Sequence, residues 1–253
     1  VILLSEFSTL IIYRKSLFKE TFLKPQNLLL FVLISFIAGL LLEITLHWVG
    51  KFWIFPSWTL KFYFLSFVPG FAFYWLAIVE SYIGFKAFFD YVLKGKKVPT
   101  KNFKFEKKFF KILGVVGIIL LIVSLLLFFK DYASGSANLF SALDLNSQTS
   151  NYIPPFYMVL LLFFGAWFIL EYIEVRKYNS SLIRDVIHNY KSPMLALVFG
   201  SLILGITMEI HNTLYYLWIY LHIPFEDLRI FNVEIVIIFS WITQYIFFLS
   251  LWR

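Results

Sequence analysis

The sequence predicts an all-α integral membrane protein, a six-helix bundle built from helical hairpin repeats. Three observations predict it: an apolar composition, six long apolar runs, and basic residues that alternate between the loops. The chain has 253 residues, of which 60% are apolar and 15% are charged. Soluble domains are typically about 45–50% apolar and about 25% charged. A soluble monomer and a disordered chain are therefore excluded, and the absence of Cys excludes disulfide scaffolds and thiolate-bound metals.

Each apolar run is long enough to cross a bilayer, which takes about 20 residues in a helix. The runs are continuous and do not alternate with period two, so we expect helices and not a barrel. Together they form a single transmembrane domain over residues 1–253. The six predicted spans are Asn27–Val49, Lys61–Phe85, Lys111–Phe129, Tyr152–Val175, Pro193–Leu221 and Asn232–Trp252.

The orientation follows from the basic residues, which are enriched in cytoplasmic loops. Eighteen of the 22 Lys and Arg residues fall before span 1, between spans 2 and 3, between spans 4 and 5, or at the end of the chain. We therefore expect both termini in the cytoplasm and the protein in the cytoplasmic (inner) membrane. Residues 1–26 form a cytoplasmic or interfacial segment. The net charge of +7 then indicates topology and lipid contacts, with no nucleic-acid partner.

Two segments resemble each other and predict an internal repeat. Gly39–Pro56 and Gly205–Pro224 each begin with Gly-x-x-x-Glu and continue to Trp-Ile-aromatic and a Pro. We expect the hairpins at about 27–85 and 193–253 to be two copies, with 111–175 as a more divergent third. All three hairpins start on the inner side, so their axis would run along the membrane normal, and a site would lie between the repeats.

Ionisable side chains inside the spans mark the candidate site, because they are costly there and face a protein interior or a cavity. Glu43 and Glu209 lie at matching depth in the outer halves of spans 1 and 5. His47 follows Glu43 by one helical turn, and His211 and Asn212 follow Glu209. This cluster is compatible with a proton-donating acid pair, with a metal site, or with polar contacts that join helices.

A second group of acids lies near the predicted cytoplasmic ends of spans 2 and 4: Glu80, Glu171 and Glu174. Long side chains near the ends of spans extend to the interface and pair there. We expect these acids to pair with the basic residues that follow them in the sequence. The expected partners are Lys86, Arg176 and Lys177.

The loop between spans 5 and 6 contains Pro224-Phe225-Glu226-Asp227. It resembles the Pro-x-Glu-(Glu/Asp) motif of bacterial and archaeal membrane lycopene cyclases and carotenoid hydratases. The Glu followed by a Trp-x-aromatic turn in both hairpins is also similar, and about 100 residues are covered in two patches. The first hairpin departs from the pattern, because Pro56-Ser57-Trp58 carries no acid pair.

This resemblance implies a protein that binds or modifies an isoprenoid by acid catalysis. A carboxylic acid would protonate a terminal double bond, without a cofactor or a metal. It implies catalytic roles for Glu43, Glu209, Glu226 and Asp227. Three neighbours would support them: His47, His211 and Asn212.

The first hairpin also resembles bacterial multi-pass membrane proteins without an assigned function, and that resemblance implies no chemistry. It rests on Gly39–Glu43, Lys51–Phe55 and Gly70–Glu80. Other functions stay open at this point. They are an accessory subunit bound to other membrane subunits, a transporter or proton channel using Glu43, Glu209 and Gln244, and a haem protein with His47 and His211 as ligands. In each case membrane lipids surround the chain.

Overall fold

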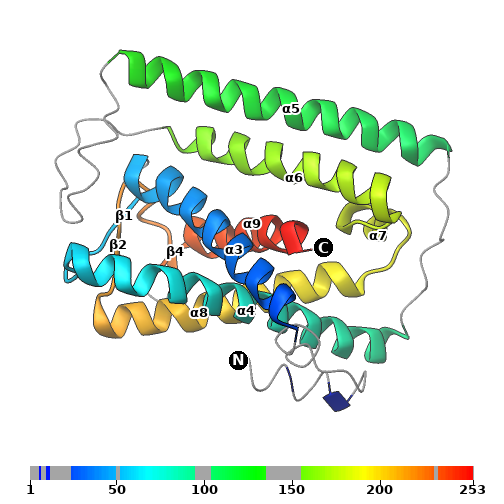
Figure 1. Cartoon of the computed structure of the whole chain (residues 1–253), viewed down its shortest axis with the longest axis horizontal. Helices are drawn as coiled ribbons and strands as arrows, with labels where there is room; N and C mark the ends of the chain where they lie inside the picture. Colours follow the sequence, from blue (N-terminus) through cyan, green and yellow to red (C-terminus); the bar gives the residue numbers. More distant parts are fainter. Residues whose placement is uncertain are drawn as a thin grey trace.

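The computed structural model describes residues 6, 10, 11, 24–49, 52–94, 104–134, 155–230 and 233–252. In this part the chain is mostly helical, with two short two-stranded sheets at one end (Figure 1). The helices are α3 (Pro25–Leu42), the π-helix η1 (Glu43–Val49), α4 (Leu60–Leu93), α5 (Lys104–Ala133), α6 (Phe156–Tyr178), α7 (Leu182–Ile187), α8 (Ser192–Tyr215) and α9 (Ile235–Trp252). The strands are β1 (Trp53–Ile54), β2 (Ile219–Tyr220), β3 (Arg229–Ile230) and β4 (Val233–Glu234).

Four helices are long and apolar enough to cross a membrane: α3, α5, α6 and α8. Helix α4 adds a fifth span if its two parts, Leu60–Ser66 and Pro69–Leu93, cross together with a bend of 41°. Helix α9 covers the sixth predicted span but has only 18 residues, slightly fewer than the ~20 that a straight span needs. The helical membrane class is therefore supported, while the count of six spans stays a prediction.

Several element boundaries differ from those expected. Helix α8 ends at Tyr215, six residues before the predicted end of span 5 at Leu221, and the chain then turns into β2. The outer end of the first span is not α-helical, because a π-helix begins at Glu43. Helix α4 continues to Leu93, beyond the predicted end at Phe85. Lys86 and Asp90 lie one turn apart in this extension and stabilise it with an ion pair of 2.9 Å. Helix α5 begins at Lys104, seven residues before the predicted start of span 3 at Lys111, so its first turns contain Phe105, Phe109 and Phe110.

Helix α5 packs along α6 on the outside of the molecule (Figure 1). The two backbones meet at glycines, as is common where membrane helices approach closely. A Cβ atom placed on Gly117 would lie 2.7 Å from the carbonyl oxygen of Gly165. Because the atom that this Cβ would meet belongs to the backbone, no side-chain movement can make room for a larger residue at Gly117.

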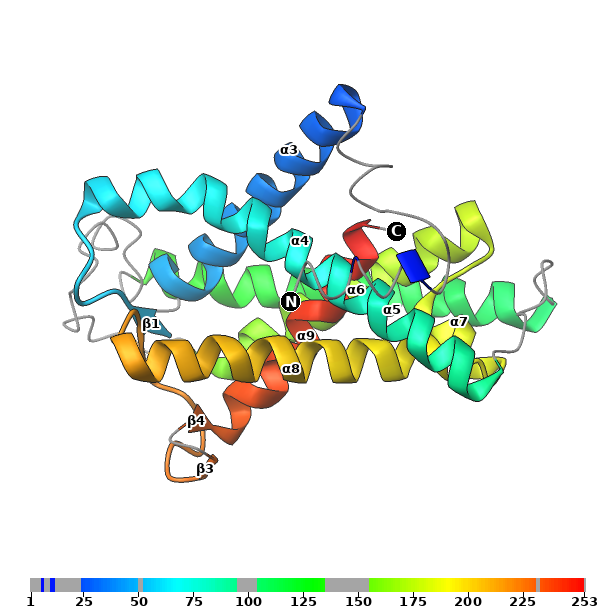
Figure 2. The ribbon, with the colours of Figure 1, turned by 90° about the horizontal axis from the view of Figure 1, so that it is seen from below.

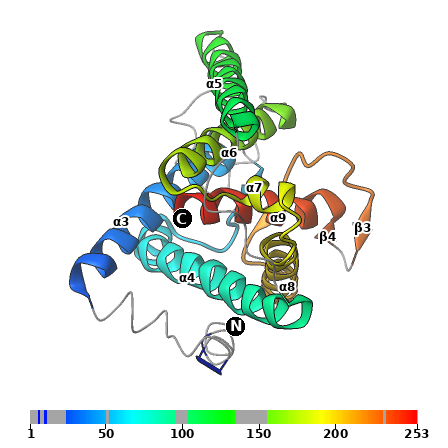
Figure 3. The ribbon, with the colours of Figure 1, turned by 90° about the vertical axis from the view of Figure 1, so that its right-hand side faces the viewer.

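Helix α9 lies in the middle of the molecule, with α6, α4 and α8 around it (Figure 3). Its inner face is fully buried through Tyr245 and Phe248. Phe248 meets Trp75 of α4 edge to face, with ring centroids 4.5 Å apart, and such aromatic pairs add about 0.5–1.5 kcal/mol to the burial itself. The main hydrophobic core is therefore built around the last helix of the chain.

The two segments of the predicted repeat meet in the structure. Strand β1 pairs with β2 in antiparallel fashion, with Trp53 opposite Tyr220 and Ile54 opposite Ile219. Figure 2 shows this small sheet at the end of α8, where the chain leaves the helices. The backbone N–H of Leu221 also donates to the carbonyl of Phe52 at 2.8 Å. The segment after η1 and the segment after α8 are thereby held together.

We predict that Gly117→Ala destabilises the protein by about 1–3 kcal/mol, because the added methyl overlaps the α6 backbone. Gly70→Ala is the matched control, since a Cβ there would meet no atom within 4 Å and alanine favours the helix by up to about 1 kcal/mol. Thermal unfolding in mild detergent measures both variants. Equal midpoints for the two variants would contradict the glycine contact.

Candidate functional site

A cavity of about 410 Å³ lies between η1 and β1 on one side and α4, α6, β2 and α9 on the other. Its walls are mostly apolar and aromatic, and include Phe52, Phe55 and Trp58 from the first loop. Among the described residues that line it, Glu43 is the only one with a carboxyl group. The cavity therefore presents one acidic group to an otherwise hydrophobic space.

Glu43 is buried, with 5% of its surface exposed, and two side chains hold it. The hydroxyl of Tyr63 donates to its Oε2 at 2.9 Å, and Nδ1 of His47 lies 3.0 Å from the same oxygen. The π-helix begins at Glu43 and ends beyond His47. Such helices are rare and frequently occur at functional sites. The unusual backbone thus coincides with the one carboxyl group of the cavity wall.

The ring of His47 lies in an aromatic shell. Its centroid is 5.0 Å from that of Phe55 and 5.9 Å from that of Tyr63. The ring is fully buried, and its Nε2 atom has no hydrogen-bond partner in the described part of the chain. One ring nitrogen therefore faces Glu43, and the other lies among aromatic side chains without a hydrogen-bond partner in the described residues.

Glu209 is also buried but does not line the cavity. Its Oε1 accepts hydrogen bonds from the Tyr220 hydroxyl at 2.5 Å and from Nε1 of Trp241 at 3.3 Å. Both donors line the cavity. Of the two carboxyl groups predicted to face a shared space, Glu43 reaches it directly, and Glu209 lies behind the wall and contacts it through Tyr220 and Trp241.

Asn212 and His211 have different surroundings although they are adjacent in sequence. Asn212 is buried, and its Oδ1 accepts from the backbone N–H of Trp218 at 2.9 Å. This bond shapes the turn between α8 and β2, and so positions Tyr220. His211 is exposed, with its ring 4.7 Å from that of Tyr215, and it does not line the cavity.

The predicted acid pair Glu226 and Asp227 is exposed, in the loop between β2 and β3. Neither residue lines the cavity. The backbone carbonyl of Glu226 accepts a hydrogen bond of 2.9 Å from Nε of Arg229. The structure therefore brings together Glu43, His47 and the donors to Glu209, but it leaves this pair on the surface.

The sequence alone did not identify Tyr63 as part of the site. It lies 20 residues after Glu43, on the next helix, and no regular spacing connects the two. The sequence also gave no sign that the side chains of Tyr220 and Trp241 bond to Glu209. Gln244 was a polar candidate, and its Oε1 accepts from the Tyr74 hydroxyl at 2.8 Å at the cavity wall.

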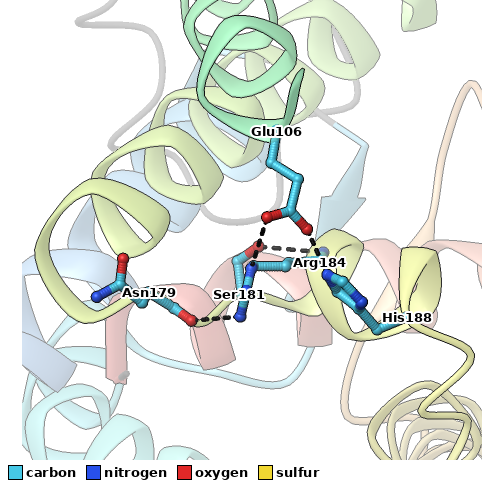
Figure 4. Close-up of polar contacts among 5 residues, drawn as sticks. All are labelled: Glu106, Asn179, Ser181, Arg184 and His188. Carbon is cyan, nitrogen blue, oxygen red and sulfur yellow. Dashed lines mark hydrogen bonds and ion pairs between the residues drawn. The ribbon is translucent and has the colours of Figure 1, made fainter. Parts of the chain in front are cut away.

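A second polar cluster, shown in Figure 4, joins α5 to the segment around α7. Glu106 forms an ion pair with Arg184, with 3.6 Å between Nε and Oε2, and also contacts Nε2 of His188. Arg184 donates to the backbone carbonyl of Asn179 at 2.6 Å, and the Ser181 hydroxyl accepts from the Arg184 N–H and begins α7. Glu106 and Arg184 are almost fully buried.

The expected pairing of the inner acids has a different form in the structure. Lys86 contacts Asp90, and Arg176 and Lys177 are exposed. Glu171 is fully buried and accepts from the Trp167 indole at 2.9 Å and from the backbone N–H of Ile183 at 3.1 Å. An indole from the preceding turn of α6 and a backbone N–H from α7 therefore bond this acid, and sequence spacing could reveal only the indole.

Metal binding was one of the three interpretations of the outer cluster. In the described part of the chain, no group of three or more His, Asp or Glu side chains is arranged to hold a metal ion. The two histidines considered for haem differ in environment, because His47 is fully buried and His211 is exposed. The geometry on which we can build is therefore the cavity and its hydrogen-bonded carboxyl groups.

Comparisons with protein-family models, with curated proteins and with solved structures find no match to this chain. No relative therefore supplies a fold, an activity or a set of functional residues. The similarity to lycopene cyclases and carotenoid hydratases rests on short motifs, and one of them, at Glu226 and Asp227, lies outside the cavity. The cavity and its hydrogen-bonded carboxyl groups are the features of this chain that bear on its function.

We predict that Arg184→Met lowers the free energy of unfolding by about 3–5 kcal/mol, because it removes the guanidinium from beside the buried carboxylate of Glu106. Arg176→Met is the control, since Arg176 is exposed near the end of α6, and we expect a change below about 0.5 kcal/mol. Unfolding in detergent measures both. A small effect at Arg184 would show that the cluster does not anchor α5.

Proposed function

We propose that this protein binds a neutral, isoprenoid-type lipid in the cavity, with the carboxyl group of Glu43 placed against the bound molecule. The observation that carries the proposal is the single carboxyl group in an aromatic wall. An apolar pocket with a few well-placed polar groups is the usual form of a small-molecule site. A volume of about 410 Å³ lies within the range of roughly 300–1,000 Å³ that such pockets have.

The walls favour a lipid without a phosphate group. The described lining contains no Lys, Arg or His, and these are the usual partners of phosphate. The charge of a phosphate group would therefore be buried in this apolar space without a cation from the described lining, which is costly. Aromatic and aliphatic side chains suit the branched hydrocarbon of an isoprenoid. We therefore propose a neutral lipid and not a phospholipid or a polyprenyl phosphate.

The same geometry supports an acid-catalysed step. The Glu43 carboxylic acid would transfer its proton to a terminal double bond, so that its O–H bond breaks and a C–H bond forms on the lipid. The resulting cation would close a ring with a neighbouring double bond and then return a proton to the carboxylate. No oxidant or reductant is needed, and the aromatic faces of the wall can stabilise the cation. His47 and Tyr63 would hold the carboxyl group in place.

We further infer that the chain crosses the inner membrane six times, with both termini in the cytoplasm, and that its first and last hairpins are copies. The charge distribution of the loops supports the orientation. The register of β1 and β2 supports the repeat, because Ile54 and Ile219 are equivalent positions and pair with each other. Gly39 and Gly205 are also equivalent, and each faces an aromatic ring of the returning helix, Phe71 or Trp241.

We predict that protein purified in mild detergent carries a neutral isoprenoid in about equimolar amount. Absorption from 300 to 700 nm and mass spectrometry of the organic extract measure it. An empty extract together with co-purifying chains would contradict the proposal and favour an accessory subunit. A Soret band would indicate haem. A phospholipid as the stoichiometric ligand would contradict the argument against phosphate.

We predict that Glu43→Gln abolishes conversion of the bound lipid but retains binding, because an amide keeps the shape of the side chain and cannot act as the acid. Asp131→Asn is the matched control, since α5 contributes no residue to the cavity lining. Glu226→Gln tests the alternative from the resemblance. If Glu226→Gln abolished conversion while Glu43→Gln had no effect, the acid would lie in the loop and the proposed role of Glu43 would be wrong.

A further inference from the structure

We infer that the ligand enters the cavity sideways from the membrane, through the helix wall at Gly70 and Phe239. The identity of the ligand rests on the function proposed above, whereas the position of the opening rests on the structure. Three described residues that line the cavity are exposed on the molecular surface: Gly70 of α4, Leu160 of α6 and Phe239 of α9. The other described lining residues are buried or half-buried.

All three exposed residues lie within helices. Gly70 lies ten residues after the first residue of α4, and Leu160 and Phe239 each lie four residues after the first residue of α6 and α9. At 1.5 Å per residue this is about 15 Å and about 6 Å along the helices. The three spans run in the same direction across the membrane in the proposed topology. The opening would therefore face the hydrocarbon of the outer leaflet and not water.

The sequence of α4 explains why its wall is open at this position. Proline cannot donate a backbone hydrogen bond and disturbs the preceding turn, and Pro69 begins the second part of the bent helix. Gly70 follows directly and has no side chain. A Cβ placed on it would meet no atom within 4 Å. The bend and the missing side chain together leave a gap beside the cavity.

The end of the cavity that would face water is closed, unlike the helix wall at Gly70. The cavity is closed there by Phe52 and Phe55 from the loop after η1, and by Ile223 after β2, all of which are buried. The β1–β2 pair ties these two loops together. A water-soluble ligand would have to separate them, whereas a lipid dissolved in the membrane meets the gap at Gly70 and Phe239 directly.

The absence of Cys allows a direct test by single-cysteine spin labelling in phosphatidylcholine vesicles. Nitroxides at Gly70→Cys and Phe239→Cys are expected to be more accessible to oxygen, which dissolves in lipid, than to a water-soluble nickel chelate. Glu226→Cys, in the exposed loop, is the aqueous reference and is expected to show the opposite preference. Chelate access at positions 70 and 239 equal to that at position 226 would overturn the inference.

A second test measures entry itself. Vesicles that contain lycopene as the probe are mixed with vesicles that contain the protein, and uptake is followed by absorption. Gly70→Trp is expected to slow uptake at least tenfold, because an indole would fill the gap. Leu126→Trp, on the exposed face of α5 and away from the cavity lining, is expected to match the unsubstituted protein. Equal melting temperatures show that both variants are folded. An unchanged rate for Gly70→Trp would overturn lateral entry at this position.

The two tests separate the failure of lateral entry from the failure of the proposed function. If the nitroxides face lipid but the unsubstituted protein takes up no lycopene and carries no isoprenoid, the opening stands and the proposed ligand class is wrong. If the protein binds lycopene while the nitroxides at positions 70 and 239 face water, the ligand class stands and the lateral route is wrong.

Discussion

The hydrogen bonds of Glu43 are the interaction on which the arrangement of the cavity depends. A carboxyl group in an apolar wall is costly unless donors satisfy it, and here the donors come from two elements. His47 is supplied by η1, and Tyr63 by the first part of α4. Both side chains meet one oxygen at the place where the chain changes from α-helix to π-helix and before it returns in α4. This corner therefore buries the acid together with two hydrogen-bond partners.

A sheet of two short strands connects this corner to the segment that follows α8. Strands β1 and β2 have two residues each, yet their pairing places Trp53 across from Tyr220, whose hydroxyl reaches Glu209. The two buried carboxyl groups are thus linked through one small sheet at the end of the cavity. Helix α9 completes the arrangement from the centre of the molecule and contributes Trp241 as the second donor to Glu209.

The packing of α5 depends on contacts that lie outside the cavity. The close approach of α5 and α6 at Gly117 and Gly165 needs only small residues, and the Glu106–Arg184 pair fixes the start of α5 to the chain around α7. Helix α6 also reaches the cavity through residues such as Phe163, while α5 does not. The outer helix therefore adds membrane-facing surface without shaping the site.

Much of the architecture could be predicted because apolar runs and charged loops are local patterns. The five longest helices and α9 overlap the six expected runs, and burial of Glu43 and Glu209 followed from their place inside two of these runs. The partners of the two acids could not be predicted in this way. Tyr63 and Trp241 lie 20 and 32 residues from the carboxyl groups they bond, and nothing in their spacing distinguishes them from the other aromatic residues.

The sequence by itself determined that the chain is a helical membrane protein, because hydrocarbon accepts only long apolar segments whose backbone is bonded internally. It also identified which carboxyl groups lie inside those segments. Only the tertiary structure decided which of them reaches the cavity. Glu43 lines it, Glu209 lies behind Tyr220, and Glu226 is exposed. Depth in a span is a property of local sequence, whereas access to a cavity depends on how distant helices and loops pack together.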